Sequence, residues 1–191
     1  MLSEVPEEWQ KAQIGELFSV VTKGTTPTSV GFSFEESGVP FIKVENVSED
    51  GRIDSGSMSF VSEECHRKLA RSVISKNTIL YSIAGTIGRT AVYLEEHESN
   101  TNQALALMHG LDASRVSQSF IVQYPRSSVV KNIFEAQKTV GAQPNISLKQ
   151  LKELPVPFPP INEQQRIGEI LSSVDASIQA TQAVIEQVER V

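Results

Sequence analysis

The C-terminal segment 162–191 constrains the fold more than any other part of the 191-residue chain. It contains no proline and a single glycine, Gly168. Its apolar residues recur at alternating intervals of four and three, the heptad spacing of a coiled coil, with Thr181 in the one remaining position. At ~1.5 Å per residue the helix would be about 44 Å long, which is more than the rest of the chain can cover. We therefore predict that it pairs with another helix, through the dimerisation residues Ile167, Leu171, Val174, Ile178, Ile185 and Val188.

The segment before this helix is rich in proline. Four prolines between positions 155 and 160 cannot continue a helix, so residues 155–161 predict an extended, semi-rigid hinge. Asn162 is the expected N-cap of the long helix, and Gln165 is placed to complete a capping box. The chain thus divides into a globular part over 1–154, a proline-rich hinge over 155–161 and a long helix over 162–191.

The globular part predicts an α+β fold. Ser62 is a suitable N-cap for a helix over 63–71, and residues 114–138 are expected to be helical with an interruption at Pro125. The strands and helices do not alternate regularly, which argues against a doubly wound parallel sheet. Alternating or continuous apolar runs predict strands over 41–47, 78–83, 91–94 and 103–108.

Composition limits the classes of function. An apolar content of 39% with 21% charged residues is typical of a globular protein, and no apolar run approaches the ~18 residues of a membrane span. A single cysteine, Cys65, excludes an intramolecular disulfide and fits a reducing cytoplasm. The formal charge of −6 argues against a small protein that holds nucleic acid by bulk electrostatics alone.

Positive charge is nevertheless concentrated in two stretches. Residues 66–94 carry five lysines and arginines and no carboxylate, and residues 99–152 carry six against two carboxylates. If the fold gathers these stretches, the protein has a basic face and an acidic back. The alternative is two ordinary solvated surfaces.

The sequence offers no motif for catalysis. It contains neither a phosphate-binding loop nor a nucleophile elbow, and it contains no His-Glu-x-x-His pair. The spacing of His66, His97 and His109 is not that of a metal site. We therefore predict no catalytic residue and no metal ligand.

Four loops are instead rich in small residues that form hydrogen bonds. Amide side chains pair with adenine, guanidinium groups pair with guanine, and hydroxyls and lysines hold phosphates. The same residue types are also ordinary turn formers, so each loop taken alone has two interpretations. The candidate DNA-binding residues are Lys23, Thr25, Thr26, Thr86, Arg89, Asn102, Gln103, Gln143 and Asn145.

The order of these motifs resembles the specificity subunits of type I restriction–modification systems. The junction before the long helix is similar to that family's boundary between a target recognition domain and a conserved helical spacer, and the resemblance covers nearly the whole chain. The residues that carry it are Lys23-Gly24-Thr25-Thr26-Pro27, Val39-Pro40-Phe41-Ile42-Lys43, Gly85-Thr86-Ile87-Gly88, Asn102-Gln103-Ala104, Pro144-Asn145-Ile146-Ser147, Leu154-Pro155-Val156-Pro157, Pro159-Pro160, Glu163-Gln164 and Ile167.

The resemblance implies a non-catalytic DNA reader in the cytoplasm. It implies a mixed α/β target recognition domain with a curved β-sheet, whose loops read one half of a bipartite site in double-stranded DNA, followed by a long C-terminal coiled-coil helix that packs antiparallel in a homodimer. Adenine methylation with S-adenosylmethionine would belong to the methyltransferase (modification) subunit. Cleavage with ATP and magnesium would belong to the endonuclease (restriction) subunit, so no cofactor and no membrane contact is expected for this chain.

The resemblance also leaves alternatives open. The usual subunit of the family carries two recognition units in tandem and this sequence carries one, so it is either a half-length subunit or the first half of a longer chain. The heptad pattern that still runs at Val191 favours the second reading. A coiled-coil interaction or adaptor module that does not bind DNA explains the helix and the charge equally well, and a stand-alone nuclease would cleave DNA with magnesium alone.

Overall fold

The computed structural model describes residues 5–137 and 145–189. Its strands are β1 Gln10–Gln13, β2 Phe18–Lys23, β3 Val39–Ile42, β4 Ser59–Val61, β5 Val73–Ile74, β6 Ile79–Ser82, β7 Thr90–Val92, β8 Ser99–Thr101, β9 Leu105–Leu111 and β10 Pro155–Phe158. Its α-helices are α1 Ile14–Leu17, α2 Glu63–Lys68, α3 Gln118–Ile121, α4 Ser128–Ala136, α5 Leu148–Lys152 and α6 Ile161–Glu189. Short 3-10 turns are η1 Pro27–Val30, η2 Val44–Asn46, η3 Ala70–Ser72 and η4 Tyr124–Arg126.

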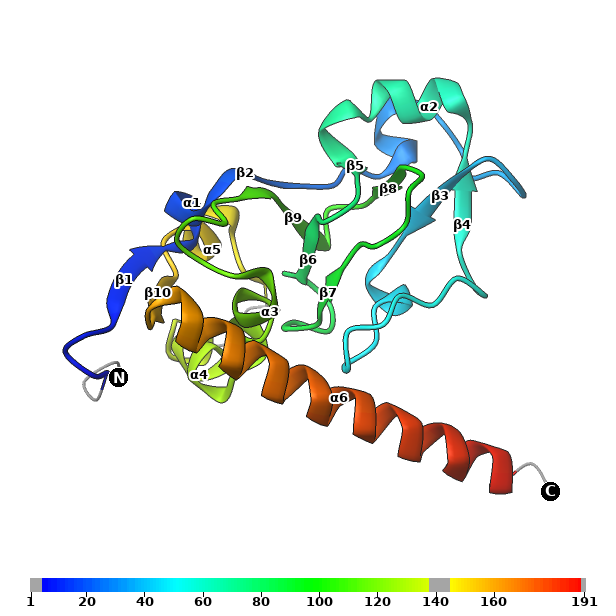
Figure 1. Ribbon diagram of the computed structural model, residues 1–191. Helices are drawn as coiled ribbons and strands as arrows, with labels where there is room; N and C mark the ends of the chain where they lie inside the picture. The colour runs from blue at the N-terminus through cyan, green and yellow to red at the C-terminus, as the bar shows by residue number, and fades with distance from the viewer. Residues whose placement is uncertain (1–4, 138–144, 190–191) are drawn as a thin grey trace.

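A four-stranded antiparallel sheet lies at the centre of the molecule, in the order β2-β9-β6-β7 (Figure 1). Its two middle strands are buried on both faces because their side chains alternate between two hydrophobic clusters. Ile79 and Tyr81 of β6 contact the cluster beside α3, α4 and α5, whereas Leu80 faces the opposite cluster. Burial on both faces explains why the first three residues of β6, Ile79 to Tyr81, are consecutive apolar residues in the sequence.

A second four-stranded sheet covers the other face of this central sheet, in the order β4-β3-β8-β5. Ile42 and Ile74 of this second sheet pack on Leu80 and Leu107 of the central sheet. The outer side of the second sheet is covered by α2, whose Cys65 is buried with Phe41 and Val61. The result is a set of layers that runs from the helices through both sheets to α2.

The proline-rich segment forms an extended strand, β10. It pairs antiparallel with β1, so that Gln10 lies opposite Phe158 and Gln13 lies opposite Pro155. Val156 and Phe158 are buried in the large cluster, and the Tyr124 hydroxyl donates a hydrogen bond to the Pro155 carbonyl at 2.7 Å. The segment that leads into the long helix is therefore fixed on the globular part.

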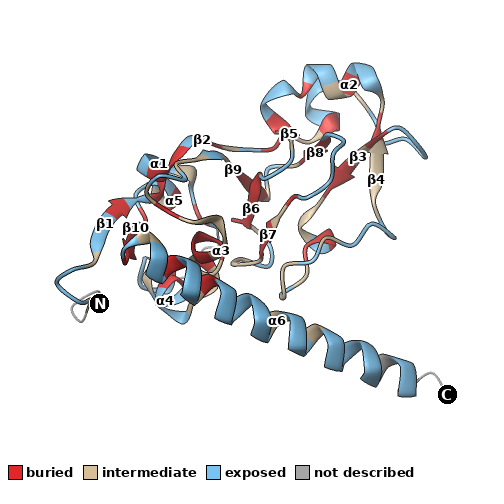
Figure 2. Ribbon diagram, in the orientation of Figure 1, coloured by how far each residue is buried: buried red, intermediate tan, exposed pale blue. Residues whose placement is uncertain are grey.

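Helix α6 follows at once and is 29 residues long. Its first half runs along α3, and its second half projects beyond the rest of the molecule (Figure 1). Most of its surface is exposed (Figure 2). The predicted α+β architecture with a long C-terminal helix is confirmed, while the coiled coil and the curvature of the sheet stay predictions.

Two predicted elements end earlier in the structure than in the sequence analysis. The strand predicted over 41–47 ends at Ile42, because the buried side chain of Asn46 accepts a hydrogen bond from the Lys43 N–H at 2.9 Å and turns the chain into η2. The helix predicted over 63–71 ends at Lys68 and continues as η3. Its predicted N-cap is present, since Ser62 Oγ accepts a hydrogen bond from the Cys65 N–H at 3.2 Å.

The predicted start of the long helix was also wrong by one residue. The helix begins at Ile161, so Asn162 lies in its first turn and is not the N-cap. The Pro160 carbonyl instead accepts the N–H groups of Glu163 and Gln164, at 2.9 and 3.1 Å. The region 114–138 is divided as expected at Pro125, into α3, η4 and α4.

Candidate nucleic-acid interface

The described candidate residues gather along one edge of the central sheet. Because its strands are antiparallel, the end of β2, the start of β9, the end of β6 and the start of β7 all meet there: Lys23 lies opposite Ala106, and Ser82 lies opposite Leu105. Asn145 joins this edge through a bridge to Ala84. We call this surface the loop edge, comprising residues 23–26, 84–89, 102–104 and Asn145, together with Arg71, whose guanidinium contacts Thr25.

The first loop lies directly on the connection between the two sheets. The Gly24 N–H donates to the Leu105 carbonyl at 3.3 Å, and the Thr25 N–H donates to the Thr101 carbonyl at 3.0 Å. A Cβ atom at position 24 would lie 2.2 Å from the Thr101 carbonyl oxygen, so only glycine allows this approach. The loop from β2 is thereby held against the turn that joins β8 to β9.

Side-chain contacts extend this arrangement. The Thr26 hydroxyl donates to Gln103 Oε1 at 2.5 Å, which joins two predicted residues 77 positions apart in the chain. The Thr25 hydroxyl accepts a hydrogen bond from Arg71 Nη2 at 3.1 Å. Lys23, Gln103 and Arg71 are exposed, so their polar groups remain accessible at this edge.

Arg71 is a residue that the sequence analysis missed as a candidate. It lies within η3, and no ion pair involves its guanidinium within the described residues. Its position in the sequence, next to a short helix and far from any loop motif, gave no signal of its place. Only the basic stretch 66–94, to which it belongs, could have pointed to it.

Other predicted residues at the loop edge also hold the structure together. Arg89 Nη1 donates to the carbonyls of Val44 and Val47, at 3.2 and 2.9 Å, so its guanidinium fixes η2. Asn102 Oδ1 accepts from the Ala104 N–H at 3.0 Å and closes a turn. Thr86 and Asn145 are exposed, with their side chains open to solvent. Gln143 lies outside the described residues.

A cleft of about 630 Å³ lies beside the loop edge. Thr86, Arg89 and Asn145 line it, together with Lys131 of α4 and the aromatic ring of Tyr81. Burial raises the pKa of the Tyr81 hydroxyl well above its ordinary value, so this group stays protonated. The lining thus combines cations and amides with two carboxylates, those of Glu49 and Glu135, beside the rings of Tyr81 and Phe134.

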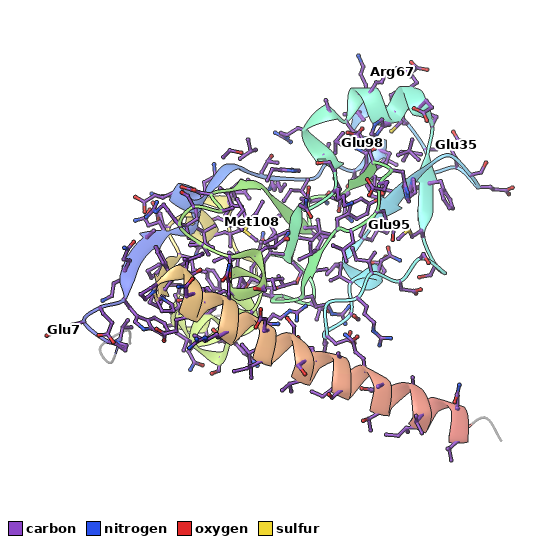
Figure 3. The ribbon with its side chains drawn as sticks, viewed as in Figure 1. Glu7, Glu35, Arg67, Glu95, Glu98 and Met108 are labelled. Carbon is purple, nitrogen blue, oxygen red and sulfur yellow. The ribbon has the colours of Figure 1, made fainter. Side chains whose placement is uncertain are left out.

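The basic stretch 66–94 lies among acidic residues in the structure. Lys76 forms an ion pair with Glu96, and His66 Nε2 lies 3.2 Å from Glu98. Figure 3 shows Arg67 at the outer side of α2, with Glu98 and Glu35 nearby in the same part of the molecule. Positive charge is thus partly balanced here, and a cation at the loop edge such as Arg71 stands out from its neighbours.

Five of the six predicted dimerisation residues on α6 are exposed. Leu171, Val174, Ile178, Ile185 and Val188 are between 40% and 69% exposed, whereas Ile167 packs on the core. A shallow groove runs along this part of the helix, and it is lined by Val174, Ser177, Ile178, Thr181 and Ile185. Ile170 and Val184 are also exposed, and they extend the apolar face of the helix beyond the predicted dimerisation residues.

The start of α6 is attached to the globular part by Gln164, a residue that the sequence analysis did not single out for this role. Its side chain is fully buried. Gln164 Oε1 accepts from the Ser117 N–H at 2.9 Å, and its Nε2 donates to the carbonyls of Arg115 and Pro159, at 2.9 and 2.8 Å. Gly168, one turn later, allows Ser119 to approach the helix closely, because a Cβ there would lie 2.3 Å from Ser119 Oγ.

No cluster of three or more metal-ligating side chains occurs in the described ranges 5–137 and 145–189. In the same part of the chain, none of the helices has the length and apolar character needed to cross a membrane.

Comparison with known proteins shows the family of this chain. The family model described as the type I restriction modification DNA specificity domain matches residues 6–190. A Methanocaldococcus jannaschii chain whose name assigns it as the MjaX type I specificity subunit is 27% identical over 97% of this chain and 44% of its own length. The EcoBI type I specificity subunit of Escherichia coli is 25% identical over 85% of this chain and 34% of its own length.

The fold is also found among solved structures. The crystal structure of an HsdS subunit from Thermoanaerobacter tengcongensis superposes with a TM-score of 0.67 at 21% identity, over 95% of this chain and 41% of that one. The chain therefore spans less than half the length of the relatives that it matches.

Proposed function

The chain belongs to the type I restriction modification DNA specificity family, and on this basis we propose that it reads one half of a bipartite target in double-stranded DNA. In this proposal it directs adenine methylation and DNA cleavage that partner subunits carry out, and it contributes no catalytic residue and no cofactor of its own. The observation that carries the proposal is the loop edge, where every described candidate residue lies at one end of one sheet.

The chemistry of the loop edge supports reading of base edges. Gln103 and Asn145 are exposed amides suited to adenine, and Arg71 is an exposed guanidinium suited to guanine or to phosphate. Lys23, Thr25 and Thr26 are suited to phosphate contacts. Arg89, whose Nη1 already holds two carbonyls, and Asn102, which closes a turn, would act mainly by shaping the loops, while Gln143 stays a candidate from the sequence alone.

The second part of the proposal concerns α6. We propose that its exposed apolar residues pack antiparallel against the same helix of a second copy. Two reading heads, by which we mean the globular parts over 1–154, would then be held a fixed distance apart. An exposed seam of Val174, Ile178 and Ile185 on a helix that leaves the globular part supports this, since a monomeric protein rarely exposes such a continuous apolar face. In a longer chain, a second copy of the unit would supply the partner helix.

The net charge of −6 fits a complex in which another subunit supplies most of the attraction to DNA. We propose that the methyltransferase subunit provides most of the electrostatic attraction to DNA, with S-adenosylmethionine bound there, and that the endonuclease subunit uses ATP and magnesium. This chain would then supply positioning and base contacts. Cytoplasmic action is part of the proposal, and the single buried Cys65 agrees with a reducing compartment.

The test measures DNA binding by fluorescence anisotropy at about 50 and about 200 mM salt, with and without the cognate methyltransferase subunit. We expect weak, strongly salt-dependent binding by the chain alone and a large gain in affinity and sequence preference in the complex. Arg71→Ala should reduce the affinity of the complex for its preferred sequence by about 5- to 150-fold, as loss of a contact of about 1–3 kcal/mol implies. Arg67→Ala removes an exposed cation on α2 and serves as the matched control.

Two outcomes would overturn the proposal. An adaptor that does not bind DNA would form the same helix-paired dimer but would show no dependence on DNA in any assembly. A stand-alone nuclease would cleave DNA on incubation with magnesium alone.

A further inference from the structure

One arginine joins the long helix to two parts of the reading head. Arg126 lies in η4, and its side chain is 18% exposed. Nη1 forms an ion pair with Asp175 of α6 at 3.3 Å. Nη2 donates to the carbonyls of Thr90, at 2.6 Å, and of Asp50, at 3.3 Å. A single guanidinium therefore contacts the helix, the first residue of β7 and the turn before β4.

The head side of this contact is built around a glycine. A Cβ atom at Gly51 would lie 1.5 Å from Arg126 Nη2, so the guanidinium occupies space that any other residue would fill. Gly51 also has a φ of +83°, which favours glycine. Burial lowers the pKa of the Arg126 guanidinium, and the nearby carboxylates of Asp175 and Asp50 oppose that shift.

The helix side is equally specific. Asp175 Oδ2 also accepts a hydrogen bond from Gln123 Nε2 at 3.0 Å, so one carboxylate oxygen is held by two side chains of the head. Gln164 attaches the helix eleven residues earlier, about 16 Å away along its axis at 1.5 Å per residue. Two attachment points separated along a rod fix its direction, and the second also fixes its rotation.

Rotation matters because Asp175 lies beside the apolar seam. Val174 precedes it directly, and Ile178 is three residues later and thus a neighbour on the helix surface. The contact between Asp175 and Arg126 therefore sets the direction in which Val174 and Ile178 point relative to the head. On the other side, Thr90 directly follows Arg89, a residue of the loop edge.

We propose that Arg126 and Asp175 are positioning residues that set the angle and rotation at which α6 leaves the reading head, and thereby the spacing between the two half-sites. This inference rests on the proposed function, because spacing has a meaning only when two heads are joined through their helices. Neither residue is one of the predicted dimerisation residues or candidate DNA-binding residues, so we expect the pair to affect the spacing of the heads and not the bases that they read.

The test uses the complex of the full chain with its methyltransferase subunit and a DNA library in which the distance between the half-sites varies. We expect the wild type to prefer one spacing. Asp175→Asn removes the charge but keeps the shape, and should lower the preference for that spacing over neighbouring ones by about tenfold, as loss of a charge-assisted hydrogen bond implies. The half-site sequence should not change. Glu169→Gln, which removes an exposed carboxylate from the same helix, should behave as the wild type.

Two further variants separate positioning from loss of stability. Gly51→Ala should displace the guanidinium from the head side and broaden the accepted spacing in the same way as Asp175→Asn. Asp175→Glu retains the charge and should restore most of the preference. A variant that is merely less stable would lose methylation at all spacings in proportion, and that result for both Asp175→Asn and Gly51→Ala would overturn the inference.

A distance measurement keeps this test independent of the proposed function. Spin labels at Arg67→Cys, whose side chain points away from α2 in Figure 3, and at Gln182→Cys on α6 report the angle between head and helix. With an excess of unlabelled protein to suppress distances between copies, pulsed electron paramagnetic resonance should give a narrow distribution for the wild type and a broad one for Asp175→Asn. Identical distributions would overturn the inference. The wild type could also give a narrow distance distribution while its complex shows no preference for any half-site spacing in the DNA library. That combination would contradict the proposed function and not the positioning role of the pair.

Discussion

At the scale of single residues, several polar side chains in this protein hold the fold and its surfaces at the same time. Arg89 has the guanidinium expected of a base-reading residue, yet it donates to the Val44 and Val47 carbonyls. Gln164 belongs in the sequence only to a junction motif, yet its amide joins α6 to the loop before α3. The sequence identifies which residue types can form hydrogen bonds, but the partner is decided by which segments the fold brings together.

Replacement of Gln164 by alanine should destabilise the protein by about 1–3 kcal/mol, because the Ser117 N–H and two carbonyls would lose their partners in a buried site. Urea unfolding measures this loss. The matched control is Gln165→Ala at an exposed position of the same turn, which should change stability by less than about 0.5 kcal/mol. Equal effects of the two substitutions would contradict the role of Gln164 as the attachment point.

His109 gives the fold a pH dependence. Burial lowers the pKa of its ring, on β9, below the ordinary value of 6.5. The unfolded chain then takes up a proton more readily than the folded protein, so stability is full above pH 6.5 and decreases as the pH falls through 6.5 toward the folded pKa. Urea midpoints at about pH 7.5 and about pH 5 should therefore differ less in His109→Gln than in the wild type.

At the scale of elements, the periodicity of apolar residues predicted the helices and strands that have a clear local pattern. It missed strands and strand pairings that depend on partners far away in the sequence. The long helix and the strands β6, β7 and β9 were visible because apolar residues recur over several turns or form continuous runs. Strand β8 was missed because its residues, Ser99 to Thr101, are polar, and they are buried only because Thr101 Oγ1 and Asn100 find partners in other segments. β10 was expected to be extended, but its pairing with β1 was not visible, since that partner lies at the other end of the sequence.

The loop edge, too, could be predicted only as far as it depends on local sequence and not on contacts between distant segments. The residue types and the loops were predictable, because glycine, threonine and amides stand together in the sequence. Their meeting at one sheet edge depends on the antiparallel register of β2, β9, β6 and β7, and the inclusion of Arg71 depends on its contact with Thr25.

The exposed seam of α6 leads to a prediction at this scale. Val174→Asp combined with Ile178→Asp should convert a dimer into a monomer in sedimentation velocity, because two carboxylates would be placed in the centre of the paired face. The unfolding free energy of the head should stay within about 0.5 kcal/mol, since both positions are half exposed. Ser172→Asp combined with Ala176→Asp, on the other side of the helix, should remain dimeric. Unchanged sedimentation of the first variant would show that the seam does not pair two copies.

At the scale of the whole molecule, we interpret the protein as one rigid unit. Strand β10 and the two attachment points of α6 join the long helix to the layered globular part. The central sheet presents the loop edge, and Gln164 and Arg126 attach the start and the middle of α6 to the globular part. In the proposed function a chain with a net charge of −6 can still read DNA, because the methyltransferase subunit would supply most of the attraction to phosphates and only a few exposed groups at one edge would need to meet the bases.

The central claim is that the loop edge selects the DNA sequence that the assembly modifies. Mapping of methylated adenines along the genome of cells that contain the chain and its methyltransferase subunit tests it most directly. With Arg71→Ala and Gln103→Ala combined, the account predicts a methylated motif that is altered or degenerate at positions within the half-site, while Arg67→Ala leaves the motif intact. An unchanged motif in the double variant, with methylation at wild-type levels, would contradict it.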